Sequence, residues 1–131
     1  MPSQLIHTMI RVLDEERSLA FYRALGFEDH GRRRVGGDTA TIIFLGLPGD
    51  GARLELTIND GRTEPYDLGE GYGHIALTTR GSMEEEMARL EPHGIRPEKE
   101  PYAPYPGGPK ICFLRDPDGY RIELLERNPA D

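Results

Sequence analysis

A six-residue pattern, Gly-x-Arg-[Ile/Leu]-Glu-Leu, occurs twice in this 131-residue chain and constrains its fold more than any other feature. The copies are residues 51–56 and 119–124. Each copy places a carboxylate, Glu55 or Glu123, inside an apolar stretch that is typical of a β-strand. Two histidines repeat at nearly the same offset, because His7 precedes Glu55 by 48 residues and His74 precedes Glu123 by 49. A His…Glu unit present twice predicts a duplicated module.

The first half of the chain reads as a strand, a helix and three further strands. Asp14 and Ser18 are helix N-cap candidates, and Gly26 is a stop signal after Leu25. Alternating apolar residues bounded by glycine-rich turns indicate the strands. We expect strands at 5–12, 27–35, 39–45 and 53–58.

The second half repeats this order. Ser82 and Glu85 form a capping-box signature before a helix that Pro92 should close near Glu91. The segment 101–109 contains four prolines and two glycines, which predicts a loop. We expect strands at 73–79, 95–99, 110–114 and 120–126.

These patterns predict an α+β protein built from two tandem βαβββ modules, about 5–59 and 72–127, in a single domain of residues 1–131. A module of about 65 residues is marginal alone, so two copies should pack together or exchange with a partner chain. Mixed β-sheets would then form one concave cleft.

Composition narrows the range of partners and compartments. The net charge of −7 and the pI near 5.1 argue against binding to nucleic acid or to an anionic membrane surface. The apolar runs are too short to span a membrane, and the N-terminus has no signal-peptide layout. The lone Cys112 cannot form an internal disulfide, so we expect a cytoplasmic protein.

Strand alternation gives the repeated His and Glu residues a common facing. In each strand the apolar side can pack against a helix, which leaves His7, Glu55, His74 and Glu123 on the opposite face. A single such residue is usually solvated or hydrogen-bonded, so the prediction depends on the paired spacing. Two imidazoles and two carboxylates without thiolate suit Ni²⁺, Co²⁺, Zn²⁺, Mn²⁺ or Fe²⁺. His30 and His93 do not share this spacing, and we expect both at the surface.

Four segments of the chain carry a further signal: 5–12, 54–59, 71–77 and 116–124. Together they resemble the glyoxalase I (lactoylglutathione lyase) family of the vicinal oxygen chelate superfamily, whose members are built from paired βαβββ modules. The similarity extends from about Leu5 to Glu126. The combination is specific, whereas the Asp-Pro-Asp-Gly turn with its Glu strand would indicate only the superfamily.

The resemblance implies a set of site residues. His7, Glu55, His74 and Glu123 match the family's four metal-ligand positions, and family members are homodimers that build each site from the N-terminal pair of one chain and the C-terminal pair of the other. With histidine at position 7 and a short length, this chain resembles the bacterial subclass of the family, which prefers Ni²⁺ or Co²⁺ over Zn²⁺.

The same resemblance implies a binding site for glutathione as co-substrate. Arg11 and Asn59 match positions that hold its γ-glutamyl end, and Lys99 matches a basic residue near its glycyl carboxylate. Glu70 stands where some family members have arginine, and the loop 101–109 is unusually rich in proline and tyrosine. The thiol is therefore left open between glutathione and another low-molecular-weight thiol.

The implied reaction detoxifies methylglyoxal. A carboxylate takes the C1 proton of the methylglyoxal–glutathione hemithioacetal and returns it to C2, which gives S-lactoylglutathione. A carboxylate near its reference pKa of about 4.3 is a weak base for a carbon acid, so a metal must stabilise the developing charge. We expect Glu123 to be the principal base and Glu55 its counterpart.

Two other functions fit the same fold. One is a different metalloenzyme of the superfamily, an epimerase or a dioxygenase, although a dioxygenase typically uses two histidines and one carboxylate. The other is a metal-free binding protein of the bleomycin-resistance type. Those proteins lack the full ligand set, which is complete here.

Overall fold

The repeat in the sequence corresponds to two structural units. The computed structural model describes residues 1–127. One unit is Met1–Tyr66 and the second begins at Asp67. The predicted modules, about 5–59 and 72–127, each fall within one unit. Residues 128–131 of the predicted domain lie outside the described part of the chain.

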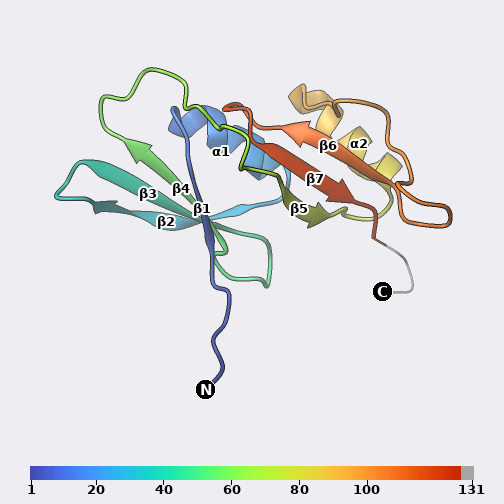
Figure 1. Ribbon diagram of the computed structural model, residues 1–131, viewed down its shortest axis with the longest axis horizontal. Helices are drawn as coiled ribbons and strands as arrows, with labels where there is room; N and C mark the ends of the chain where they lie inside the picture. The colour runs from blue at the N-terminus through green and yellow to red at the C-terminus, as the bar shows by residue number, and fades with distance from the viewer. Residues whose placement is uncertain (128–131) are drawn as a thin grey trace. The chain divides into compact units, whose positions relative to one another are not determined.

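The first unit is a mixed four-stranded sheet in the order β1-β4-β3-β2, with one helix. Strand β1 is parallel to β4, and the other neighbouring pairs are antiparallel. Figure 1 shows the residues before β1 leaving this sheet as an extended segment. The elements are β1 (Thr8–Arg11), α1 (Glu15–Ala24), β2 (Glu28–Val35), β3 (Ala40–Gly46) and β4 (Leu54–Asn59).

Helix α1 starts and ends at the predicted signals. The Asp14 carboxylate accepts a hydrogen bond from the backbone N–H of Arg17 at 2.8 Å, which caps the first turn. The other cap candidate, Ser18, is buried inside the helix. Gly26 follows the helix with φ of 104°, a left-handed conformation that glycine adopts without strain.

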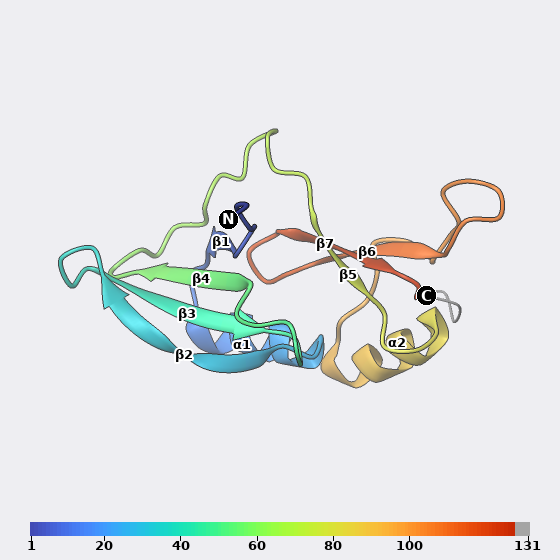
Figure 2. The ribbon, with the colours of Figure 1, turned by 90° about the horizontal axis from the view of Figure 1, so that it is seen from below.

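The core of this unit lies on one side of the sheet. Ile10 and Val12 in and after β1, and Leu54 and Leu56 in β4, are all at most 5% exposed. They share this side with α1, which Figure 2 shows along one face of the strands. The odd-numbered residues of β1 and β4, including Glu55, therefore point to the other face.

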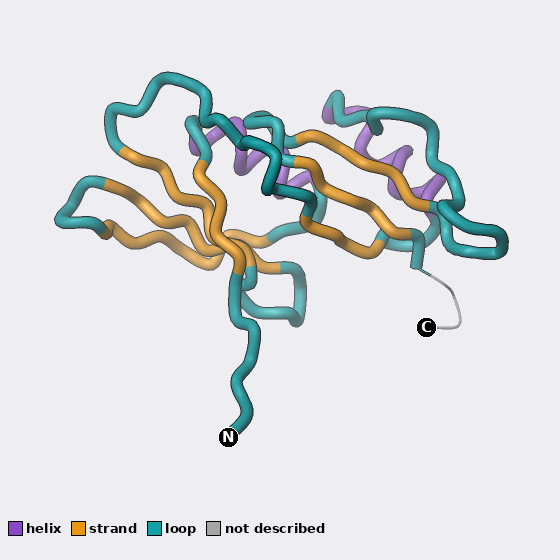
Figure 3. Tube along the Cα trace, viewed as in Figure 1, coloured by secondary structure: helices purple, strands orange, loops and turns teal. Residues whose placement is uncertain are grey.

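The second unit has a mixed three-stranded sheet in the order β5-β7-β6, with β5 parallel and β6 antiparallel to β7. Figure 3 shows its strands in orange and, in teal, the long loop that leads to β6. The elements are β5 (Ile75–Thr78), α2 (Met83–Leu90), the 3₁₀ helix η1 (Glu91–His93), β6 (Ile111–Arg115) and β7 (Arg121–Leu125). The predicted α+β class with two mixed sheets is confirmed.

Helix α2 begins at the predicted capping box and carries a buried acid. Ser82 Oγ accepts a hydrogen bond from the N–H of Glu85 at 3.1 Å. Glu86 is 2% exposed and pairs with the guanidinium groups of Arg80 and Arg89. Burial raises the pKa of Glu86, but the hydrogen bonds from Arg80 and the pairing with Arg89 outweigh burial, so the pKa lies below the ordinary 4.5.

The predicted strand at 95–99 is wrong. This segment is irregular and contains Pro97, with Pro101 just beyond it; neither proline can donate a ladder hydrogen bond. Glu98 N–H donates to the carbonyl of Phe113 at 2.8 Å, and the Tyr102–Ile111 bridge is isolated. The second unit therefore has the order β-α-β-β.

The first strand of each half is shorter than predicted. The structure has Thr8–Arg11 instead of 5–12, and Ile75–Thr78 instead of 73–79. As a result, His7 and His74 both lie just before a strand. No helix in residues 1–127 is long and apolar enough to cross a membrane.

Candidate metal centre

His7 and Glu55 form the first of two equivalent pairs. Met9 lies opposite Glu55 in the parallel ladder, which places His7 two residues before that point on the same face. His7 Nδ1 lies 3.2 Å from Glu55 Oε2, and the Glu55 side chain is only 11% exposed.

His74 and Glu123 form the second pair in the same way. Ala76 lies opposite Glu123 in the parallel ladder between β5 and β7, again two residues after the histidine. His74 Nε2 lies 3.6 Å from Glu123 Oε1, and the Glu123 side chain is 14% exposed. The predicted His…Glu repeat is therefore a repeat of strand register as well as of sequence.

A phenylalanine completes each copy. Phe44 lies opposite Glu55 in the antiparallel ladder, and Phe113 lies opposite Glu123. Each carboxylate is consequently placed between a histidine on one side and an aromatic ring on the other. Neither ring was predicted from the sequence, although pairing the strands of the two repeats would have set each phenylalanine opposite its glutamate.

The geometry of each pair fits two ligands of one metal ion. Nitrogen and oxygen ligands at about 2.0–2.2 Å from an ion lie roughly 2.8–3.6 Å from each other for octahedral to tetrahedral angles. The separations of 3.2 and 3.6 Å are close to this range. Residues 1–127 contain no group of three or more His, Cys, Asp or Glu side chains that could hold a metal.

The surroundings of His74 are ordered by ring contacts and ion pairs. The Phe113 ring meets the His74 ring edge-on at 5.2 Å, and the Arg121 guanidinium lies 4.0 Å from the centre of the Phe113 ring on its face. Glu98 accepts two hydrogen bonds from Arg121 at 3.1 and 3.0 Å. Arg121, acting ahead of burial and of Arg115, holds the pKa of Glu98 below its ordinary value.

A small pocket of about 270 Å³ opens beside this cluster. Its lining includes Lys99, whose ammonium group lies 3.9 Å from the centre of the Tyr102 ring. The pocket therefore carries positive charge next to the residues that contact His74. It is lined by Glu98, Lys99, Tyr102, Phe113 and Arg121.

Arg11 and Asn59 lie on the face of Glu55, as predicted. Arg11 is opposite Thr57 in the ladder, and Asn59 follows Thr57 by two residues in β4. Asn59 Nδ2 donates a hydrogen bond to the Tyr66 hydroxyl at 2.9 Å. Thr57 Oγ1 is buried and has no hydrogen-bond partner in residues 1–127.

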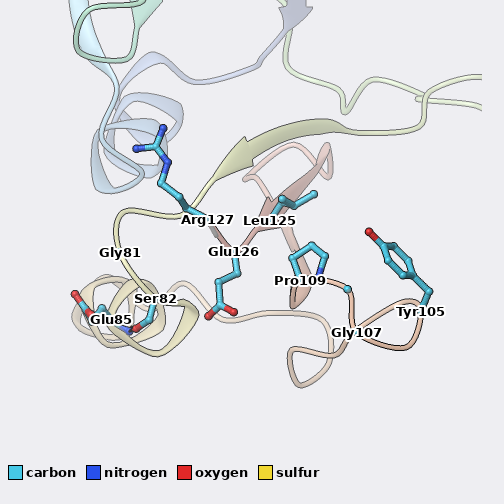
Figure 4. A pocket seen from close by; sticks show the side chains of 10 residues that line it. Gly81, Ser82, Glu85, Tyr105, Gly107, Pro109, Leu125, Glu126 and Arg127 are labelled. Atoms are coloured by element: carbon cyan, nitrogen blue, oxygen red, sulfur yellow. Dashed lines mark hydrogen bonds between the residues drawn. The ribbon is translucent and has the colours of Figure 1, made fainter. Parts of the chain in front are cut away.

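A larger groove of about 830 Å³ lies at the other end of β7. Figure 4 shows the Glu126 side chain directed toward Ser82 and Arg127 directed away from it. The Glu126 carboxylate accepts a hydrogen bond from Met83 N–H at 2.8 Å, so it caps α2. The groove contains neither His–Glu pair and is lined by Gly81, Ser82, Glu85, Tyr105, Gly107, Gly108, Pro109, Leu125, Glu126 and Arg127.

The histidines outside the repeat are at the surface, as expected. His30 and His93 are both exposed, as is Glu70.

Burial raises the pKa of the Cys112 thiol to about 11, with a smaller effect from the nearby Glu86 carboxylate.

The fold agrees with a family comparison. Residues 4–124 match the family described as the Glyoxalase/Bleomycin resistance protein/Dioxygenase superfamily. The chain belongs to this superfamily. This match confirms the family resemblance seen in the sequence.

Curated relatives in the superfamily are lactoylglutathione lyases. The probable lactoylglutathione lyase of Synechocystis is 38% identical over 125 residues, which is 93% of this chain and 94% of the relative. The lactoylglutathione lyase of Salmonella typhimurium is 38% identical over 130 residues, or 97% of this chain and 95% of that protein.

Solved structures of superfamily members agree with the fold. The trypanothione-dependent glyoxalase I of Leishmania major has a TM-score of 0.79 at 38% identity, covering 95% of this chain and 87% of that one. The glyoxalase I of Zea mays has a TM-score of 0.84 at 31% identity, covering 95% of this chain and 44% of that one.

Proposed function

We propose that this chain is a metal-dependent lactoylglutathione lyase. It isomerises the hemithioacetal of methylglyoxal and a thiol, with glutathione as the first candidate, to the S-lactoyl thioester. The observation that carries this proposal is the occurrence of both His–Glu pairs at equivalent points of two sheets. Relatives named lactoylglutathione lyase, at 38% identity over nearly the whole chain, support the same reaction.

Two copies of the chain are needed for a complete site in this proposal. Each His–Glu pair supplies two ligands, and four are expected around the ion. A homodimer would combine the pair His7 and Glu55 of one chain with the pair His74 and Glu123 of the other. Two-fold symmetry then generates two identical sites, so one ion binds per chain.

The bound ion would supply Lewis-acid polarisation of the substrate oxygens. The mixed nitrogen and oxygen ligands suit first-row divalent metals. The resemblance of His7 to the bacterial subclass favours Ni²⁺ or Co²⁺ among them, with Zn²⁺ as a further candidate. The carboxylates have a second role, because a proton must move between two neighbouring carbon atoms. We assign removal of the C1 proton to Glu123 and the complementary role on the other side of the substrate to Glu55.

Recognition of the thiol is assigned to residues outside the ligand set. Arg11 and Asn59, on the Glu55 face, would hold the γ-glutamyl end of glutathione, and Lys99 would lie near its glycyl carboxylate. The relative from Leishmania major is described as trypanothione-dependent, so the thiol can differ between members of this superfamily. A cytoplasmic location is proposed from the buried, unpaired Cys112.

The test is reconstitution of the metal-free protein. Chelator-treated protein receives Ni²⁺, Co²⁺ or Zn²⁺, and thioester formation is followed with methylglyoxal and several thiols, glutathione among them. We expect no turnover without metal and restored turnover with Ni²⁺ or Co²⁺. Metal binding without thioester formation from any thiol would favour another metalloenzyme of the superfamily, and absence of metal binding would favour a bleomycin-resistance-type binding protein.

A further inference from the structure

The two His–Glu pairs differ in what holds the histidine. The His74 ring is in edge-on contact with Phe113 at 5.2 Å and an interplanar angle of 70°. Arg121 covers the face of the same Phe113 ring at 4.0 Å. His74 therefore has an aromatic support that is itself covered by a cation.

Arg121 is fixed in this position by Glu98. Two guanidinium nitrogens of Arg121 donate to the two carboxylate oxygens of Glu98, which is the fork geometry that restricts both groups. Glu98 is in turn held by its own backbone N–H, which donates to the Phe113 carbonyl at 2.8 Å. The contacts form a closed loop of Glu98, Arg121 and Phe113 against the histidine.

The corresponding residues in the first unit do not make this arrangement. Arg53 occupies the Arg121 position of the repeat, but its guanidinium pairs with Asp50 and donates to the Leu5 carbonyl. Phe44 has Arg33 near its ring, but at the longer distance of 5.8 Å. In residues 1–127, the His7 ring contacts no aromatic ring.

We propose that Arg121 is a positioning residue that acts through Phe113 to hold the His74 imidazole ready for the metal. This inference rests on the proposed metal site. The His74 side chain is 41% exposed, so without the Phe113 contact its ring would rotate in water. That rotational freedom would be lost when the imidazole binds the metal, which weakens binding. Within residues 1–127, the His74 imidazole is then held by a ring contact that the His7 imidazole lacks.

The test measures metal binding and not turnover. We compare wild-type protein with Arg121→Met, Phe113→Leu and Arg115→Met by calorimetric titration of the metal-free proteins with Co²⁺. Arg115 is the matched control, because it also pairs with Glu98, at 2.8 Å, but does not cover Phe113. Thermal unfolding of each metal-free protein checks that the variants fold.

We expect Arg121→Met and Phe113→Leu each to weaken Co²⁺ binding about 10-fold, the size usual for residues that orient a ligand, and Arg115→Met to change it less than about 2-fold. Arg121→Lys should restore only part of the affinity, because lysine lacks the planar fork. If Arg121→Met does not fold, Glu98→Gln, which loosens the same guanidinium, is expected to weaken binding about 3-fold.

A second readout is the ¹H–¹⁵N spectrum of the His74 ring in the metal-free protein. The signals of the protons bonded to carbon in the His74 ring should lose the shift caused by the Phe113 ring current in Phe113→Leu. The same signals should broaden in Arg121→Met, while the His7 signals stay in place. Equal Co²⁺ affinity and unchanged His74 signals in Arg121→Met would overturn the proposal. Wild-type protein that binds Co²⁺ but forms no thioester would overturn the proposed reaction alone, and wild-type protein that binds no metal would overturn both.

Discussion

His7 Nδ1 lies 3.2 Å from Glu55 Oε2, although one residue precedes the first strand of its sheet and the other lies within the fourth. The parallel pairing of β1 with β4 brings them together, because it sets Met9 opposite Glu55. The same register recurs for His74 and Glu123. A metal site built from both pairs would need both carboxylates, but the proposed reaction gives Glu123 and Glu55 different roles.

The first prediction separates the roles of the two carboxylates. Glu123→Gln should lower thioester formation about 10²–10⁴-fold, because it removes the group assigned to C1 proton transfer, while part of the metal affinity remains. Glu55→Gln should lower turnover less. Steady-state rates are measured with metal content determined on the same samples, and full activity of Glu123→Gln would refute the assignment.

The second prediction concerns the buried acid in α2. Glu86→Gln should cost roughly 1.5–3 kcal/mol of unfolding free energy, because it removes a buried charge from Arg80 and Arg89, which are themselves partly exposed. Urea denaturation measures the change. The exposed Glu84→Gln in the same helix is the control and should change stability by less than about 0.5 kcal/mol.

The same pair of proteins predicts a pH dependence. The pKa of Glu86 is lower in the folded protein than its ordinary 4.5, so the folded state binds fewer protons on this group than the unfolded state. The stability that ionised Glu86 contributes is complete above the ordinary pKa of 4.5 and is lost as the pH falls through the lower folded-state pKa. The stability difference between wild type and Glu86→Gln should therefore shrink in acid, and a constant difference would contradict the ion-pair account.

The sequence predicted the two His–Glu pairs better than it predicted the edges of the sheets. Repeat spacing and strand alternation were sufficient to place His7, Glu55, His74 and Glu123 on corresponding faces. The pair of hydrogen bonds between Arg121 and Glu98 could not be predicted, because Glu98 lies in an irregular loop to which no periodicity applies. The wrong strand at 95–99 lies in the same irregular segment, where Pro97 has no N–H to donate to a strand ladder.

Burial was also only partly predictable. Alternation in β4 implied an open face for Glu55 and Thr57, yet each, taken as a whole residue, is at most 9% exposed. The neighbouring strands β1 and β3 cover them from either side, and a single strand's pattern does not record that contact.

The third prediction uses the hydroxyl of Thr57, which has no hydrogen-bond partner within residues 1–127. Thr57→Val should raise the unfolding free energy by about 1 kcal/mol, because the wild-type hydroxyl is desolvated without a hydrogen bond. Thr79→Val is the matched control: its hydroxyl donates to the Gly81 carbonyl at 2.7 Å and accepts from Arg127 N–H at 3.1 Å. Thr79→Val should lower the unfolding free energy by about 1–2 kcal/mol. Urea denaturation compares the two variants, and a Thr57→Val protein less stable than Thr79→Val would refute this account of the Thr57 hydroxyl.

The fourth prediction concerns Cys112. Its side chain is buried and its thiol pKa is about 11, against an ordinary value of 9.0. At mildly alkaline pH the native protein should react with iodoacetamide at least about 100-fold more slowly than the urea-unfolded chain. Mass spectrometry follows the labelling, and equal rates in the two states would show that Cys112 is accessible.

The central claim is that each metal site takes one His–Glu pair from each of two chains. Mixing His7→Ala and His74→Ala protomers through unfolding and refolding tests this most directly. Each variant alone should be inactive, whereas the mixed dimer regains one intact site, so an equal mixture should show about a quarter of wild-type metal-dependent thioester formation. A mixture as inactive as its two parents, while refolded wild type is active, would contradict the shared site.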